Sequence, residues 1–204
     1  MGYREEYDRS ITDPEAYWAE QARLVDWIRK PGQVLDDSRK PFYRWFPDAT
    51  LNTCFNALDR HVVAGHAERT ALIYDSPVTD TKQRFSYADL LEKVAAFAGA
   101  LRGFGVEKGD RVVIYMPMIP EAVIAMLACA RLGAVHSVVF GGFAPHELAI
   151  RIDDAEPKVV VSASCGIEPT RLVEYKPMLD KALELSTHKP GTCVIKQRDQ
   201  ARAD

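Results

Sequence analysis

The sequence predicts an α/β fold in which helices wind over both faces of a mostly parallel sheet. Three observations lead to this prediction. From residue 111 onward, short β-branched segments alternate with amphipathic helical segments. Nearly every residue of the short segments is apolar, as in strands that are covered on both faces. The region before residue 67 is different, because it is rich in aromatic residues and helical in pattern.

The N-terminal part, residues 1–66, is predicted to be a helical segment, and it holds all three tryptophans. Asp13 followed by Pro14 predicts a helix start, with a capping side chain and proline in the first turn. We expect this helix to continue to the Pro-Gly pair at 31–32. Asn52 is expected to cap a second helix that ends near Gly65. The remaining residues, 67–204, are predicted to form the α/β part.

The α/β part is expected to open with a hairpin and a helix. Residues 71–74 and 83–85 are strand candidates on either side of a turn containing Pro, Asp and Thr. Ser86 follows directly and is a suitable cap for a helix that ends at Gly103 or Gly105.

Strands and helices then alternate to the end of the sequence. The expected strands are 111–115, 135–140, 158–163 and 193–196, and the expected helices are 121–132, 145–154 and 175–185. In open parallel sheets, ligands bind beyond the carboxyl ends of the strands. The candidate binding loops are therefore 116–120, 141–144 and 164–170.

Composition excludes several classes of function. The 26 basic and 29 acidic residues give a net charge of −3, which offers no general attraction for nucleic acid or anionic membranes. The longest apolar run, 122–130, is too short to cross a bilayer. The four cysteines form no CxxC pair, and no histidine pair has helical ligand spacing with an acidic partner, so we expect no metal site. These features predict a reduced, cytoplasmic protein in which any anion binding must come from a local site.

The loop after the predicted strand 135–140 contains Phe140, Gly141 and Gly142, with Pro145 just beyond. Two glycines allow the backbone to approach a ligand closely, and the following helix N-terminus offers N–H groups to an anion. The flanking phenylalanines are suited to stack on a planar ring. The alternative is a tight turn between two core phenylalanines. The loop is not GxGxxG, which leaves a dinucleotide-binding Rossmann motif without support.

A second candidate loop delivers Glu168, Pro169, Thr170 and Arg171 to the same rim of the sheet. Arg171 is suited to bind a phosphate or carboxylate through two parallel hydrogen bonds. The alternative is a surface arginine beside acidic residues. No residue in either loop is assigned a catalytic role, because no base is matched to a nucleophile.

Four stretches of the sequence are informative together: 17–27, 45–61, 109–117 and 130–143. They resemble the N-terminal portion of the acetyl- and propionyl-coenzyme A synthetases, which belong to the adenylate-forming superfamily. The resemblance covers residues 10–196 and includes the Phe-Gly-Gly-Phe motif at 140–143. Residues 164–169 and 174–177 resemble the propionyl-type branch more than the acetyl-type branch.

The resemblance implies a two-step ligation. A carboxylate attacks the α-phosphate of ATP to give an acyl-adenylate and diphosphate, and the thiol of coenzyme A then displaces AMP. It also implies that Phe140, Gly141 and Gly142 line the coenzyme A nucleotide site, and that residues 168–171 lie against its ribose 3′-phosphate. The acetyl-type pattern has two arginines in this loop. Here Glu168 replaces the first, which weakens the phosphate clamp because a glutamate opposes an anion.

The sequence lacks the Ser/Thr/Gly-rich loop and Pro-Lys-Gly motif that the family uses on ATP phosphates. The residues for ribose, Mg²⁺ and the catalytic lysine are also outside it. We therefore expect an N-terminal fragment of such a ligase, catalytically incomplete alone, that self-associates through an exposed sheet edge or apolar face. The alternatives are a non-catalytic module that binds coenzyme A or a nucleotide, and an assembly piece.

Overall fold

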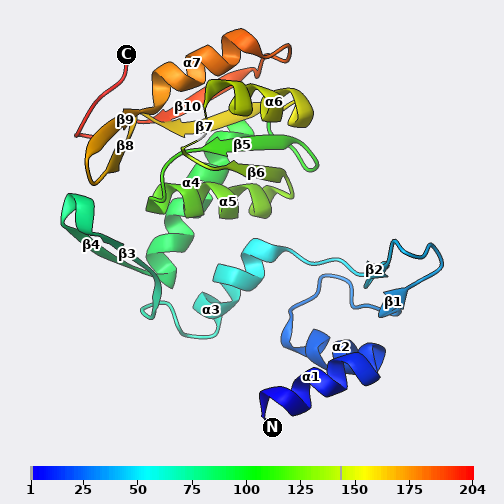
Figure 1. Cartoon of the computed structure of the whole chain (residues 1–204). Coiled ribbons are helices and arrows are strands. Elements are labelled where there is room, and N and C mark those ends of the chain that lie inside the picture. Colours follow the sequence, from blue (N-terminus) through cyan, green and yellow to red (C-terminus); the bar gives the residue numbers. More distant parts are fainter. Residues whose placement is uncertain (1, 143) are drawn as a thin grey trace. The chain divides into compact units, whose positions relative to one another are not determined.

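The computed structural model describes residues 2–142 and 144–204, and these fold into two compact units that divide between Asn52 and Thr53. The helices of the first unit are α1 (Tyr3–Thr12), α2 (Pro14–Gln21) and the 3-10 turn η1 (Ala22–Leu24), and its short strands are β1 (Leu35–Asp36) and β2 (Arg44–Trp45). β1 and β2 pair antiparallel. This helical, aromatic-rich unit is shown in blue in Figure 1.

The helix expected to run from Pro14 to residue 30 is shorter than predicted. The Asp13 side chain caps α2 as expected, accepting from the N–H of Ala16 at 3.1 Å. The chain leaves the helix at Val25, which is extended. The Trp27 indole N–H bonds back to the carbonyl of Ala22 at 2.7 Å. The Trp27 indole thus satisfies a carbonyl group of the last helical turn, and the helix ends before the Pro-Gly pair.

The second unit opens with a helical turn that packs into its core. This turn comprises the π-helix η2 (Phe55–Asp59) and α3 (Arg60–Val63). Cys54 and Leu58 are buried among residues of the second unit. The second unit thus begins at residue 53, so the helix expected over 52–65 in the N-terminal segment belongs to the second unit except for Asn52.

The hairpin and its helix are confirmed. β3 (Thr70–Ser76) pairs antiparallel with β4 (Thr81–Ser86), joined by the 3-10 turn η3 (Pro77–Thr79). α4 (Tyr87–Gly103) starts at Ser86 with a complete capping box, in which Ser86 and Asp89 each bond to the backbone of the other.

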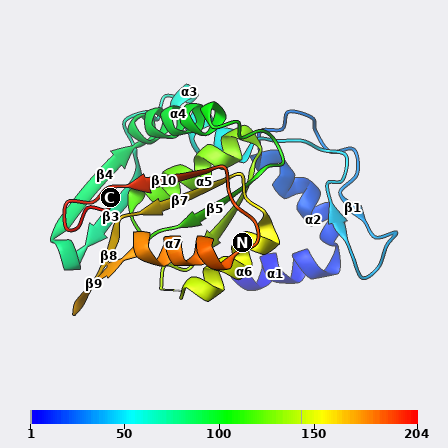
Figure 2. The ribbon, with the colours of Figure 1, turned by 90° about the horizontal axis from the view of Figure 1, so that it is seen from above.

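The predicted alternation forms a four-stranded parallel sheet. Its strands are β5 (Arg111–Tyr115), β6 (Val135–Val139), β7 (Val159–Ala163) and β10 (Thr192–Lys196), in the order β10-β7-β5-β6. The helices between them are α5 (Pro120–Leu132), α6 (Pro145–Ala155) and α7 (Tyr175–Leu185). α4 and α5 cover one face of the sheet, and α6 and α7 cover the other (Figures 1 and 2).

Alternation along the central strand explains the two layers. Val112 and Ile114 of β5 pack with α4 and α5, whereas Val113 and Tyr115 pack with α6 and α7. β5 comes first in the sequence, and its neighbours β6 and β7 lie on opposite sides of it. The chain therefore changes direction beside β5, and such switch points form ligand crevices.

β6 departs from the expectation of a strand covered on both faces. Val135 and Val138 are about half exposed, at 53% and 49%. The reason is that, among the described residues, β6 pairs with β5 alone and borders the sheet. Burial on two faces holds for the inner strands β5 and β7.

Residues 164–170, expected to form a loop, instead begin a second hairpin. β8 (Cys165–Glu168) pairs antiparallel with β9 (Arg171–Glu174), and Pro169 and Thr170 form the turn. The turn lacks the Asn-Gly or Asp-Gly dipeptide that is typical of two-residue hairpins, so no local pattern predicts it.

Candidate functional site

The first predicted loop leaves the carboxyl end of β6 and turns at once. The Phe140 side chain is 71% exposed. A Cβ placed on Gly142 would lie 2.8 Å from Cε1 of Phe140, so the phenyl ring lies across Gly142. Phe143, the last residue of the Phe-Gly-Gly-Phe motif, lies outside the described residues. The turn therefore offers an exposed aromatic ring beside a backbone without side chains.

The second predicted loop is the tip of the β8–β9 hairpin. Arg171 donates from Nε to Glu168 Oε2 at 2.7 Å and from Nη2 to Oε1 at 3.3 Å. Both side chains and the intervening Pro169 and Thr170 are exposed. The hydrogen bond from Arg171 lowers the pKa of Glu168, and the same contact raises the pKa of Arg171. The tip thus presents an ion pair rather than a lone cation.

Tyr175, the first residue of α7, joins these two loops. Its side chain is only 5% exposed. A Cβ on Gly141 would overlap the Tyr175 hydroxyl and lie 3.0 Å from Cζ, and a Cβ on Gly166 would lie 2.6 Å from Cε2. The tyrosine ring therefore fills the space that two absent side chains leave, one on the turn after β6 and one on β8.

The structure brings only some of the predicted site residues together at Tyr175. Gly141 is joined through Tyr175 to the base of the hairpin at Gly166. Glu168 and Arg171 lie two residue pairs farther along the hairpin, where they pair with each other. At the rise of an extended strand, the tip lies about 7 Å beyond Gly166. The Phe140–Gly142 turn therefore lies beside the base of the β8–β9 hairpin, and the Glu168–Arg171 ion pair lies at the tip of the hairpin.

The phenol of Tyr175 stays protonated at neutral pH. Burial, with smaller contributions from Tyr115 and the charge of Glu168, raises the pKa of Tyr175 to about 12. Its ring lies 5.0 Å from that of Tyr115, centre to centre. Tyr115 in turn donates a hydrogen bond to the thioether of Met178 at 3.7 Å. The group at the junction of the two loops is therefore a neutral ring rather than an acid or base.

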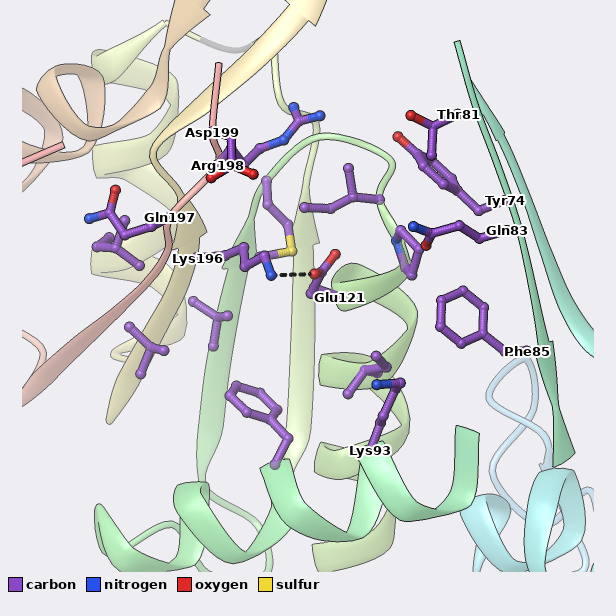
Figure 3. Close-up of a pocket in the computed structure, with 18 of the residues that line it drawn as sticks. Tyr74, Thr81, Gln83, Phe85, Lys93, Glu121, Lys196, Gln197, Arg198 and Asp199 are labelled. Atoms are coloured by element: carbon purple, nitrogen blue, oxygen red, sulfur yellow. Dashed lines mark ion pairs between the residues drawn. The ribbon is translucent and has the colours of Figure 1, made fainter. Parts of the chain in front are cut away.

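A cavity of about 760 Å³ lies at the same end of the sheet but on the opposite face. Its wall and rim include Phe85 of β4, Phe97 of α4 and the segment 196–200 after β10 (Figure 3). Its floor includes Met116 and Val161, which belong to the layer of α4 and α5. The cavity therefore adjoins the switch point beside β5.

One ion pair crosses this cavity. Lys196 Nζ lies 2.8 Å from Oε1 of Glu121, and Figure 3 shows the two side chains facing each other. The predicted loop 116–120 contributes Met116, Ile119 and Pro120 to the lining. No local pattern identifies the lining residues from β3–β4 and 196–200, because they come from elements that only the tertiary fold brings together.

Within residues 2–142 and 144–204, no group of three His, Cys, Asp or Glu side chains is placed to hold a metal ion. Among the same residues, no helix has both the length and the apolar character needed to cross a membrane.

Comparison with known proteins places two family models on the chain. The model for AMP-binding enzymes matches residues 59–204, and the model for the acetyl-coenzyme A synthetase N-terminus matches residues 3–57. The boundary between the two matches, near residue 58, lies within the helical turn that opens the second unit.

Several curated proteins are similar along the whole chain. An uncharacterized protein of Pseudomonas aeruginosa is 59% identical over 203 residues, which are 100% of this chain and 32% of that protein. The mitochondrial acyl-CoA synthetase short-chain family member 3 of Homo sapiens is 49% identical, covering 98% of this chain and 29% of its own. A propionate–CoA ligase of Escherichia coli is 47% identical, covering 99% and 32%. The chain thus spans about a third of the length of these relatives.

Proposed function

The chain belongs to the AMP-binding enzyme family, and from this premise we propose that it supplies the coenzyme A-binding portion of an AMP-forming short-chain acyl-CoA ligase. Names of similar proteins support the reaction class, because they include a propionate–CoA ligase and a short-chain acyl-CoA synthetase. Propionate is the proposed acid. In the second step the thiol of coenzyme A gives up its proton, and its sulfur attacks the acyl carbonyl of the acyl-adenylate. A C–S bond forms, and the C–O bond to AMP breaks so that AMP leaves with the bonding electron pair.

The observation that supports the proposed site is the pairing of the Phe140–Gly142 turn with the β8–β9 hairpin. The exposed ring of Phe140 is available to stack on adenine. The bare backbone at Gly141 and Gly142 lets a nucleotide approach closely. Arg171 at the hairpin tip can bind the ribose 3′-phosphate of coenzyme A, in exchange for or together with its contact to Glu168.

Calorimetry with coenzyme A tests this site on the chain itself. We expect saturable binding that Arg171→Ala weakens. Arg151→Ala is the matched control, because Arg151 is a partly exposed arginine that also pairs with a glutamate, Glu147, but on α6. No heat of binding at millimolar coenzyme A, or equal affinity in the Arg171 and Arg151 variants, would count against the site.

ATP and Mg²⁺ are the other reactants that the family implies. The described residues contain no acidic cluster that fits a metal ion, so we place no step through Mg²⁺ on them. We propose that this chain alone does not exchange labelled diphosphate into ATP in the presence of propionate. Exchange above background would overturn this assignment and make the chain an adenylating enzyme. The cytoplasmic location expected from the sequence remains a prediction.

We also propose that the exposed border of the sheet mediates self-association. β6 presents Val135 and Val138 at 53% and 49% exposure, beside a strand edge that pairs on one side only. Sedimentation velocity over a range of concentrations tests this. We expect a mass that rises with concentration and falls back to the monomer in Val138→Lys, whereas a wild-type monomer throughout would refute it.

A further inference from the structure

We propose that Tyr175 is a positioning residue that locks the turn after β6 to the β8–β9 hairpin, so that both present one continuous surface to the nucleotide of coenzyme A. The proposal rests on the proposed function, because it concerns the same site. No catalytic role is involved. What Tyr175 supplies is a fixed distance between two loops that come from different parts of the sheet.

The first step is the fit between the ring and two glycines. The Gly141 backbone lies so close to the Tyr175 hydroxyl that an added Cβ would overlap it, and Gly166 is almost as close to the other ring edge. A ring with a glycine backbone against each edge leaves no room for either loop to shift toward it. Any side chain at either position would clash with the Tyr175 ring, so both positions require glycine whatever their backbone conformations.

The second step is the anchoring of the ring itself. The backbone N–H of Tyr175 donates to the carbonyl of Ser164 at 3.1 Å, which fixes the start of α7 to the start of the hairpin. The Tyr115 ring packs on Tyr175 from the central strand β5. Ser164 is held in turn, because its Oγ accepts from the N–H of Arg198 at 2.9 Å. The ring is therefore fixed to the sheet, and the two loops are fixed to the ring.

The third step is the consequence for binding. Phe140 precedes Gly141, and Arg171 lies on the same hairpin as Gly166. A ligand that contacts both Phe140 and Arg171 must span a distance that is set by the contacts of Tyr175 with Gly141 and Gly166. We call these two contacts the Tyr175 clamp. If the clamp opens, each loop keeps its own residues but loses its position relative to the other, and the free energy of ordering them must come from the ligand.

The test uses two readouts on the chain: the dissociation constant of coenzyme A by calorimetry, and the labelling rate of Cys165 by a thiol reagent without ligand. Cys165 is fully buried next to Gly166 and reports opening of the hairpin base. All variants carry Cys193→Ser, because Cys193 is the exposed cysteine. Unfolding midpoints confirm that each variant is folded.

Four variants are compared: Gly141→Ala, Tyr175→Ala, Tyr175→Phe and the double variant Gly141→Ala/Tyr175→Phe. We expect Gly141→Ala and Tyr175→Ala each to weaken coenzyme A binding about tenfold and to speed Cys165 labelling, within the range seen for coupled neighbours. Removing the hydroxyl relieves the worst overlap in the double variant, since the next ring atom is 3.0 Å from the added Cβ. The double variant should therefore bind better than Gly141→Ala alone.

Gly99→Ala is the control, because an added Cβ there meets nothing within 4 Å. Unchanged affinity and unchanged labelling in Tyr175→Ala would overturn the proposal. Faster labelling with unchanged affinity would limit Tyr175 to a structural role and would also overturn it. If the parent chain binds no coenzyme A, the proposed function fails, and the labelling rates alone decide whether the clamp exists.

Discussion

The Arg131 guanidinium of α5 donates from Nη2 to both carboxylate oxygens of Asp59, each at 2.8 Å. Asp59 is the last residue of the π-helix η2. Both side chains are mostly buried, with exposed fractions of 28% for the arginine and 21% for the aspartate. This contact ties the helical turn that opens the second unit to the helix that covers its sheet.

Replacing Asp59 with alanine should destabilise the second unit by about 2 kcal/mol, because it removes the partner of a mostly buried charge. Urea unfolding measures the change. Asp75→Ala is the control, since Asp75 pairs with Lys82 on the exposed hairpin β3–β4 and such surface pairs contribute little. Equal losses of unfolding free energy in the two variants would show that the Arg131–Asp59 contact stabilises the second unit no more than an exposed ion pair does.

Glu168→Gln should strengthen coenzyme A binding about two- to fivefold, the range expected for one exposed charge contact. Glutamine removes the negative charge that opposes the phosphate and competes for Arg171. Calorimetry measures the change, with Glu174→Gln at the far end of the hairpin as the control. Weaker binding in Glu168→Gln would mean that Glu168 instead holds Arg171 in position for the ligand.

Acidification should not mimic that substitution at physiological pH. Arg171 lowers the pKa of Glu168 below its ordinary value of 4.5, so the carboxylate stays charged as the pH falls from 8 to 5. The Glu168–Arg171 contact stabilises the folded chain at pH values above the pKa that Glu168 has in the unfolded chain. This stabilisation is lost only as the pH falls through the lower pKa that Glu168 has in the folded chain. The ratio of coenzyme A affinities of Glu168→Gln and the parent should stay constant over pH 5–8. A ratio that approaches one near pH 5 would contradict this prediction.

Thiol reagents should label one cysteine in the folded chain and four after unfolding. Cys193 is exposed on β10, whereas Cys54, Cys129 and Cys165 are fully buried. Burial raises the pKa of Cys129 to about 12, and partial burial raises that of Cys193 above 9.0. Labelling of Cys193 should therefore be slower than that of a free thiol at pH 8 and should accelerate above pH 9. Prompt labelling of two or more thiols in the native chain would be inconsistent with the fold.

Ser86→Ala should cost about 1 kcal/mol of stability, the usual loss for an N-cap. Ser86 Oγ accepts from the N–H of Asp89 at 3.1 Å, and the Asp89 carboxylate accepts from the N–H of Ser86 at 2.9 Å. The backbone and hydroxyl of Ser86 both lower the pKa of Asp89. An NMR titration should therefore show a higher Asp89 pKa in the variant. An unchanged pKa would mean that the capping box does not form in solution.

The alternating part of the fold was predictable because its strands are apolar on nearly every residue. β5 and α7 have the bounds that the sequence predicted, residues 111–115 and 175–185. The β8–β9 hairpin was not predicted, because its strands have only four residues each and its turn, Pro169-Thr170, is not a dipeptide typical of two-residue hairpins. The edge position of β6 was also missed, since strand order is a property of the crossover connections rather than of local pattern.

The residues of the candidate site were partly predictable. Gly141 and Arg171 were identified because they follow strands of a parallel sheet, and the family resemblance implied coenzyme A as their ligand. Tyr175 was expected only as the first residue of a helix. Its contact with two glycines, one 34 residues and one nine residues earlier in the sequence, depends on how β6 and β8 are placed, which no local signal encodes.

The π-helical turn at Phe55–Asp59 has a consequence for how this protein can change in length. A residue deleted within the turn would rotate Asp59 by about 100° around the helix axis, the angle that one residue spans in an α-helix. The carboxylate would then face away from Arg131, although no side chain had been substituted. Insertions and deletions in this turn are therefore expected to be tolerated less well than replacements of its outward-facing side chains.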